Sequence, residues 1–442
     1  MGAEKQYIDL FAQHEKLIRK HSPEVMNNLR TQAFEDFKQM GFPSVNDENY
    51  RYTDVQKAFT PDYGVNLNRL DTSFKPEDVF HCDVPNLGTS LYFVVNDSYI
   101  EKTHKDKNLP DGVYVGGFQK FAESYPEVAA RYYGKAASTS RDGLIALNTM
   151  LAQDGFVIYV SKGVIVEKPM QLINILRSSV EAMANRRILV IMEPHSEARL
   201  LVCDHCIDYK KFLATQVVEI FAEEGSLFDF YELEETNDLT TRFSSLHVQQ
   251  EANSNVLVNG ITLMNGLSRN NYYIELNGEY AESTLCGMGI MDKEKHVDVY
   301  SHITHAVPNC HSTELFKNVL NDHSTGSFCA RILVKLDAQK TRAYQSNRNL
   351  LTSRDARMYS KPQLEIYADD VKCSHGMTTG QLDENALFYL RSRGIPEAEA
   401  RMMLSVAFTA DVLDHVRLEP SVESLPPVQA VVQVADKETK LE

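Results

Sequence analysis

The most constraining feature of this sequence is a stretch of more than 150 residues, starting near residue 172, that contains short strand-like runs and lacks amphipathic helices. Turn pairs such as Asn265-Gly266 and Asn277-Gly278 separate many of these runs. A strand array of this length folds as a sandwich, a propeller or a solenoid. The runs are short and nearly regular and show no strong 40-residue blade motif, so they favour a β-helix-like solenoid whose coils stack on their neighbours. The runs cover residues 187–192, 198–203, 215–222, 227–233, 244–250, 255–263, 272–276, 281–288, 296–303 and 327–336.

Helical patterns flank the strand array on both sides. Two helices are predicted within residues 4–40, followed by mixed strands and helices. Near the other end, Asp383 can cap a helix that Gly394 terminates, and a second helix follows. We therefore predict a mainly β protein with helical ends. The three predicted domains are an N-terminal helical and mixed domain, a β-helix core and a C-terminal helical domain, over residues 1–170, 171–376 and 377–442.

The last predicted helix carries a broad apolar stripe, which needs a surface to cover it. That surface is either the end of the solenoid or another protein. The residues of this stripe that we expect to contact a partner are Met403, Leu404, Phe408 and Val412.

Charge and composition exclude several classes of partner. The 442 residues carry a formal net charge of −16, which disfavours nucleic acid and anionic membrane surfaces, since both attract clustered Lys and Arg. No run of 18 apolar residues occurs, and the first 20 residues lack the apolar segment of a signal peptide. Seven scattered cysteines fit reduced thiols. We expect a cytoplasmic protein without nucleic-acid or membrane partners.

A thiol and an imidazole occur together where the strand array ends. Apolar and polar residues alternate over residues 364–369, as in a half-buried strand, and Cys373 and His375 follow with one residue between them. On extended backbone both side chains leave the same face, with Cα atoms roughly 6.5 to 7 Å apart. Gly376 is expected to turn the chain away. The spacing suits two ligands of one metal or small cluster; the alternative is a buried thiol beside a surface imidazole.

Other candidate sites have weaker patterns. Cys203-Asp204-His205-Cys206 suggests a zinc site, but on a strand Cys206 points away from Cys203 and His205, so ordinary strand residues are the favoured interpretation. The histidines between residues 296 and 323 could form a ladder on successive coils, or be separate core and surface residues. The sequence contains no phosphate-binding loop, Rossmann fingerprint or nucleophile elbow.

Longer motifs carry a family resemblance. They are Tyr50-Arg51-Tyr52-Thr53, Arg269-Asn270, residues 305–317, the run Ala-Gln-Lys-Thr-Arg-Ala-Tyr-Gln-Ser-Asn-Arg-Asn-Leu-Leu from Ala338, the block Asp-Asp-Val-Lys-Cys-Ser-His-Gly ending at Gly376, and Leu-Phe-Tyr-Leu-Arg-Ser-Arg-Gly-Ile from Leu387. Together they resemble the SufB/SufD family of iron-sulfur cluster assembly proteins over nearly the whole chain.

The resemblance is to the SufD branch more than to the SufB branch. The SufB-type cysteine that receives sulfur would fall within residues 346–350, where no cysteine occurs. The His-Glu pair of SufB is replaced by Cys373-Ser374-His375. The resemblance therefore implies a chain that cannot build a cluster alone.

The resemblance also implies an architecture and a set of partners. It implies a right-handed parallel β-helix paired edge to edge with a SufB-like paralogue, and a C-terminal helical domain bound to a SufC-like ATPase. A transient Fe-S cluster or iron would lie at the SufB interface, with His375 as the ligand from this chain and Cys373 as a secondary participant. ATP hydrolysis would belong to the SufC-like partner.

Our expectation is thus a scaffold subunit without catalysis of its own, which helps to assemble Fe-S clusters and to acquire iron. Two alternatives stay open: a polysaccharide-acting β-helix enzyme with acidic catalysts, and a structural platform without chemistry. The sequence also leaves open whether reduced flavin binds the assembled complex and whether the isolated chain forms a homodimer.

Overall fold

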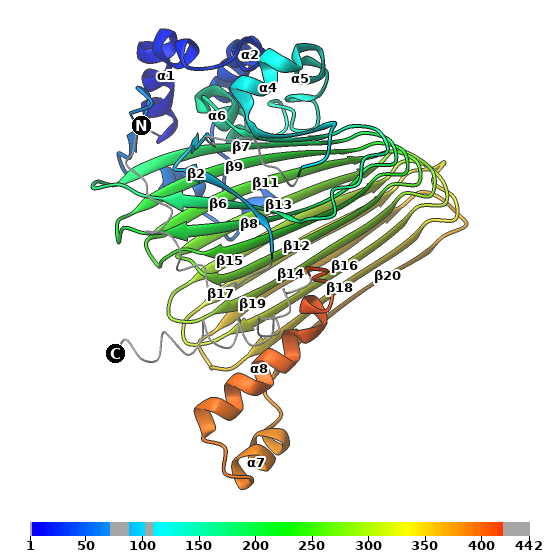
Figure 1. Cartoon of the computed structure of the whole chain (residues 1–442). Helices are drawn as coiled ribbons and strands as arrows, with labels where there is room; N and C mark the ends of the chain where they lie inside the picture. Colours follow the sequence, from blue (N-terminus) through cyan, green and yellow to red (C-terminus); the bar gives the residue numbers. More distant parts are fainter. Residues whose placement is uncertain (1, 71–87, 102–108, 419–442) are drawn as a thin grey trace.

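The chain folds as a parallel β-helix with helices at both of its ends (Figure 1). The computed structural model describes residues 2–70, 88–101 and 109–418. Cys82 and the part of the predicted C-terminal domain beyond residue 418 lie outside these ranges. The mainly β fold with helical flanks is as predicted, and the solenoid has about 8 turns. No helix among the described residues is long and apolar enough to cross a membrane.

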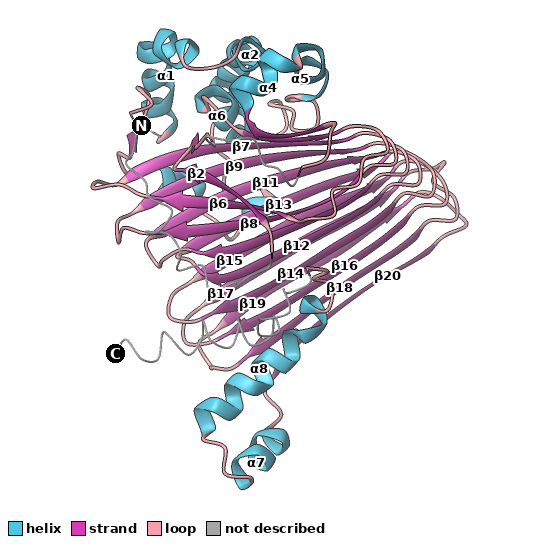
Figure 2. Ribbon diagram, viewed as in Figure 1, coloured by secondary structure: helices cyan, strands magenta, loops and turns pink. Residues whose placement is uncertain are grey.

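The N-terminal region is mixed, as the sequence predicted, and its helices gather at one end of the β-helix (Figure 2). Its helical elements are α1 (Glu4–Lys20), α2 (Glu24–Met40), the 3-10 turn η1 (Glu48–Tyr50), α3 (Val55–Phe59), α4 (Phe118–Ser124), α5 (Pro126–Tyr132) and α6 (Gly143–Leu151). Its short strands are β1 (Gly64–Val65), β2 (Ser90–Val95), β3 (Ser98–Tyr99), β4 (Val113–Gly117) and β5 (Phe156–Val160).

Two long sheets form opposite walls of the β-helix, and the chain alternates between them. Sheet A contains β1, β4 and β5 and the strands β7 (Ala182–Met192), β9 (Phe212–Ala222), β11 (Thr240–Gln250), β13 (Leu267–Leu276), β15 (His296–His305), β17 (Thr325–Val334) and β19 (Arg357–Ile366). Sheet B contains β2 and β3 and the strands β6 (Met170–Leu176), β8 (Glu197–Cys206), β10 (Leu227–Glu235), β12 (Asn255–Met264), β14 (Glu282–Met291), β16 (His311–Leu320), β18 (Arg342–Leu351) and β20 (Lys372–Gln381).

Successive coils stack in register. Leu267, His296 and Thr325 begin β13, β15 and β17 and pair directly, so each of these coils is 29 residues long. At the same corner of successive coils, just before each strand of sheet B, one residue has a positive φ. This conformation turns the chain into the next strand. Backbone bonds such as Asn253 N–H to Glu279 O (2.9 Å) join these corners. The corner residues are His195, Gly225, Asn253, Tyr280, Asn309 and Lys340.

Alternation along each strand fills the interior. Inward residues of both sheets form one continuous apolar cluster, which includes Val190, Leu200, Ile274 and Phe328. Burial of this cluster supplies the main driving force for stacking the coils.

A glycine makes room for an aromatic ring in this interior. A Cβ placed on Gly287 would lie 2.3 Å from a ring carbon of Phe316, which occupies the neighbouring coil. A side chain at Gly287 would therefore force Phe316 out of its position.

The N-terminal segment is fixed against the outside of sheet A. The Tyr50 ring lies 4.4 Å from the Arg269 guanidinium, and the Tyr50 hydroxyl accepts a bond from Asn271 (3.1 Å). Thr53 donates to Asp298 (2.5 Å), which also forms an ion pair with Arg269 (2.7 Å). Two motifs about 220 residues apart in sequence thus belong to one buried cluster.

The end of the β-helix differs from the prediction in two respects. The half-buried strand expected over residues 364–369 ends at Ile366, and a short bend leads into β20. We expected Gly376 to turn the chain away, but it lies in the middle of β20, in register with Ser346. The prediction of a turn at Gly376 was wrong. A glycine permits extended backbone as readily as a turn, and here its φ is not positive and nothing lies within 4 Å of a Cβ built on it.

The C-terminal helices follow the sequence signals closely. Helices α7 (Glu384–Ser392) and α8 (Glu397–Leu413) come directly after β20. The Asp383 side chain accepts a bond from the backbone N–H of Asn385 (2.9 Å), and Gly394 has the positive φ of a helix terminator. Helix α8 packs on the outside of sheet B beside β14 and β16.

Candidate functional site

Cys373 and His375 lie on β20, the last strand of sheet B (Figure 1). Cys373 pairs with Ala343 and His375 with Gln345 on β18, and both β18 residues are buried inward positions. In an in-register parallel sheet, side chains of paired residues stack on the same face, so Cys373 and His375 also face the axis of the β-helix. The predicted ligand pair therefore sits at the open end of the solenoid, on an edge strand.

The two groups have different surroundings. Cys373 is half-buried and contacts the apolar interior, and burial raises the pKa of its thiol above the ordinary value, against a weaker opposing bond from the Ala343 backbone. A raised pKa keeps the thiol protonated at neutral pH, which weakens it as a ligand until a metal displaces the proton. His375 is exposed. The imidazole is thus the more available ligand of the pair.

Below His375 the interior holds a carboxyl group that forms no ion pair with any described residue. Glu314 accepts bonds from the Ser301 hydroxyl (2.5 Å) and from the Gln345 amide nitrogen (2.8 Å). Burial raises the pKa of Glu314 to about 7, and these two bonds oppose the shift. The sequence reasoning did not single out Glu314. The available signal was a charged residue at an inward position of a predicted strand.

A ladder of amides lines the same end of the interior. Asn349 donates to Asn347 (2.6 Å) and accepts from Asn318 (2.9 Å), while Ser360 on β19 donates to Asn347 (2.8 Å). This ladder spans the segment 346–350, where the SufB-type cysteine would fall. Buried side-chain amides that bond one another in this way tie neighbouring coils together.

The predicted pair Cys373 and His375 does not by itself make a complete metal site. Among the described residues, no group of three or more His, Cys, Asp and Glu side chains is arranged to hold a metal ion. A small Fe-S cluster is usually held by four protein ligands, and the predicted pair Cys373 and His375 would supply two of them. A cluster or iron at this end would need ligands from another molecule.

The Cys203–Cys206 motif does not form a site. Cys203 is buried in an outer cluster with Leu201 and Tyr231, whereas Asp204 faces inward. The Cys206 thiol donates to the Asp208 carbonyl (3.1 Å). These side chains point in different directions, so the favoured interpretation as ordinary strand residues agrees with the structure.

The histidines between residues 296 and 323 are also dispersed. His305 faces inward and bonds Ser312 (2.8 Å), while His296 contacts Thr53 on the outside of sheet A (3.3 Å). His323 lies exposed in a turn. They are separate core and surface residues.

Charged residues form a buried network deeper in the β-helix, which sequence reasoning missed. Arg186 donates to Asp204 (2.6 Å), and Arg242 forms ion pairs with Asp204 (2.8 Å) and Glu232. All four side chains are at most 6% exposed. Since each cation has an acidic partner, the network accounts for its own charge and needs no ligand.

The predicted contact stripe on α8 divides into two sides. Val412 is fully buried beside Leu263 on sheet B, and Leu404 and Phe408 pack toward the same sheet. Met403 is 48% exposed. Three of the four residues thus contact this chain's own β-helix, because the stripe covers the sheet.

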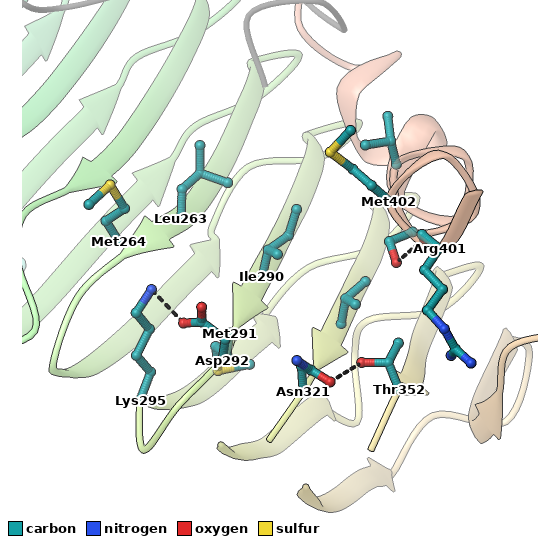
Figure 3. A pocket seen from close by; sticks show the side chains of 13 residues that line it. Leu263, Met264, Ile290, Met291, Asp292, Lys295, Asn321, Thr352, Arg401 and Met402 are labelled. Atoms are coloured by element: carbon teal, nitrogen blue, oxygen red, sulfur yellow. Dashed lines mark hydrogen bonds and ion pairs between the residues drawn. The ribbon is translucent and has the colours of Figure 1, made fainter. Parts of the chain in front are cut away.

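A cavity of about 450 Å³ remains between α8 and sheet B (Figure 3). Leu263 and Ile290 line it from the sheet, and Arg401 and Met402 line it from the helix. Helix α8 therefore contacts the sheet mainly through its C-terminal half, around Val412.

Comparison with known proteins decides the family. Residues 1–172 match the family model for the SufBD protein N-terminal region, and residues 175–408 match the model for the SUF system FeS cluster assembly SufBD core domain. The chain belongs to the SufB/SufD family. The two matched regions meet where the N-terminal helices and short strands give way to the long strands of the β-helix.

Individual relatives of the SufB/SufD family agree. The chain is 31% identical over 280 residues to the iron-sulfur cluster assembly protein SufD of Escherichia coli, covering 62% of this chain and 65% of that protein. It is 23% identical over 429 residues to SufD of Bacillus subtilis, covering 95% of each chain. A SufBD family protein of Synechocystis is 25% identical over 403 residues, covering 89% of this chain and 88% of the relative.

Proposed function

We propose that this chain is the SufD-type scaffold subunit of a SufBCD-type complex, in which an Fe-S cluster or iron is held where this chain meets a SufB-like paralogue. The observation that carries the proposal is the position of Cys373 and His375 on an edge strand at the open end of the β-helix. The chain takes part in iron acquisition and in cluster assembly, and it has no catalytic activity of its own.

The edge strand supports pairing with a second β-helix. One backbone edge of β20 pairs with β18, and its other edge has no strand partner among the described residues. Unpaired strand edges are templates for pairing with another chain. A paralogue added at this edge would bring its own side chains beside Cys373 and His375 and so complete the ligand set.

The helices at the end of the chain support docking of a SufC-like ATPase. Phe388 and Tyr389 on α7 are 72% and 56% exposed, and Met403 on α8 is 48% exposed. Exposed aromatic and methionine side chains are typical anchors of protein interfaces. We place the docking surface on these three residues, rather than on Val412, and ATP hydrolysis in the docked partner.

The cysteines favour a reducing compartment such as the cytoplasm. Among the described residues all six cysteines are free thiols, and Cys203 and Cys286 are fully buried. Free thiols persist where glutathione and thioredoxin keep them reduced.

Replacing each ligand in turn tests the proposed site. His375→Ala should leave assembly of the complex intact and reduce its iron and sulfide to background, because the available ligand is lost. Cys373→Ala should have a smaller effect, because its thiol is half-buried and protonated. The measurement is anaerobic co-purification with SufB-like and SufC-like chains, followed by absorbance and iron and sulfide analysis.

His323→Ala is the matched control, since it removes an exposed histidine from the turn between β16 and β17, whereas His375 lies within strand β20. Normal iron and sulfide in the His375→Ala complex would refute the site.

A further inference from the structure

His375 is the outermost member of a column of side chains inside the β-helix. Glu314 on β16 pairs with Gln345 on β18, and Gln345 pairs with His375 on β20. Neighbouring strands of a sheet are about 4.8 Å apart. The imidazole therefore lies one coil beyond the Gln345 amide and two coils beyond the Glu314 carboxyl group.

The Gln345 amide has one bonded end and one unbonded end. Its nitrogen donates to Glu314 (2.8 Å), whereas its oxygen is buried and has no hydrogen-bond partner among the described residues. The side chain is only 3% exposed. A buried oxygen without a hydrogen-bond donor is unfavourable, because it has lost its bonds to water. The fold thus holds an unused acceptor next to the coil that carries His375.

Glu314 sets which end of this amide is unused. Both of its carboxyl oxygens accept bonds, one from Ser301 and the other from Gln345. Because Glu314 acts as an acceptor toward Gln345, the amide must present its nitrogen to Glu314.

The neighbouring position on β18 lacks such an acceptor. Met377 on β20 pairs with Asn347, whose side-chain oxygen already accepts bonds from Asn349 and Ser360. The unused amide oxygen therefore occurs beneath the histidine and not beneath Met377.

We propose that Gln345 is a positioning residue for His375, and that Glu314 holds Gln345 in the required orientation; the ligand role of His375 itself rests on the proposed function. The structure does not contain a bond between these two groups. By a rotation of the exposed imidazole, one ring N–H of His375 donates to the Gln345 oxygen, and the other ring nitrogen is left unprotonated and faces the partner. A histidine that binds a metal usually donates its second ring N–H to a carbonyl or carboxylate, which fixes the tautomer.

The tautomer of His375 can be measured in the full chain without iron or partners. Nitrogen-15 NMR of the histidine-labelled protein, above the pH at which the imidazole titrates, distinguishes the two neutral forms. The His375→Gln variant identifies the signal by its loss. We expect a single tautomer in the wild-type chain.

Variants of Gln345 and Glu314 test whether the Gln345 oxygen is what fixes the tautomer of His375. Gln345→Leu removes the acceptor and should give a mixture of tautomers. Glu314→Leu removes the acceptor that holds the Gln345 nitrogen, so the Gln345 amide can reverse and a mixture of tautomers should result. Gln345→Glu retains an acceptor oxygen and should retain the single tautomer. Asn349→Leu is the matched control, because it removes a buried amide from the same strand beneath Thr379 and should leave His375 unchanged.

A tautomer mixture in the wild-type chain, or the same single tautomer in Gln345→Leu, would overturn the inference. In the co-purified complex, Gln345→Leu should also lower retained iron by about tenfold or more. The two proposals fail separately. A fixed tautomer with normal iron in His375→Ala would refute the ligand role alone, whereas iron that depends on His375 without a fixed tautomer would refute the role of Gln345 alone.

Discussion

At the scale of single residues, Glu314 links the fold of this chain to its proposed site. Its carboxyl group is buried in the end of the β-helix that carries His375, and it has hydrogen-bond donors but no cation beside it. By contrast, the buried carboxylate Asp204 has arginine partners. A buried acid without a cation favours its neutral form, so stability should depend on its protonation.

The free energy of unfolding should change with pH as Glu314 gains or loses its proton. The pKa of Glu314 is about 7 in the folded chain and 4.5 for an ordinary glutamate, so the folded state binds the proton more tightly. The stabilisation from that proton is fully present below about pH 4.5 and is lost as the pH rises through about 7. Glu314→Gln abolishes this loss. Between pH 5 and pH 8, the unfolding free energy of the variant relative to wild type should rise by about 3 kcal/mol.

Denaturant unfolding at the two pH values measures the difference. Glu282→Gln, which changes an exposed acid at the start of β14, should show no such pH-dependent rise. A relative stability of Glu314→Gln that is equal at both pH values would show that Glu314 is ionised throughout this range.

At the scale of elements, α8 has one side packed on this chain's own sheet B and one exposed side, on which we propose that a partner docks. Lys317 on β16 donates to the Phe408 carbonyl (2.6 Å) and forms an ion pair with Asp411, which fixes the C-terminal half of α8 on sheet B. Val412 is buried in the same contact, whereas Met403 is directed away from it.

A pair of aspartate variants separates the two sides. Val412→Asp buries an unpaired charge and should release α8 from the sheet. This release would appear as faster hydrogen exchange over residues 397–413. Met403→Asp should leave exchange and unfolding unchanged and weaken binding of the SufC-like ATPase, because it places a charge in an apolar contact. Equal ATPase binding by wild type and Met403→Asp would move the docking surface elsewhere.

The elements also show what the sequence could and could not predict. The two N-terminal helices, the Asp383 cap and the strand array follow from periodicity and turn chemistry. The repeat of the coils was not predicted, because their length varies, from 28 residues between Phe212 and Thr240 to 32 between Thr325 and Arg357. The corners also carry His195, Tyr280 and Lys340 as well as Gly and Asn. Corner geometry here depends on stacking between coils, which no local pattern records.

The candidate site was predictable only in part. The shared face of Cys373 and His375 follows from strand alternation, but the continuation of β20 beyond Gly376 depends on its register with β18. Likewise, Glu314, Gln345 and His375 form one column only because three coils align, and successive members of the column are about 30 positions apart in sequence.

At the scale of the whole molecule, the described residues cover one end of the β-helix and leave the other end, at β20, without a further strand. The N-terminal helices gather at one end, whereas β20 leaves an edge of sheet B uncovered at the other (Figure 2). Most repeat proteins cap their terminal coils because an open coil exposes backbone and interior. Here the last coil also carries the proposed ligand pair, which is the arrangement expected of half a shared site.

The central claim is that a histidine of this chain binds the iron held at the junction with its partner. The direct measurement is electron-nuclear double resonance of the reduced, paramagnetic cluster in a complex whose nitrogen-15 histidine label is in this chain alone. We predict a nitrogen-15 coupling to the cluster that is lost in His375→Ala and retained in His323→Ala. A cluster without any nitrogen-15 coupling from this chain would contradict the claim.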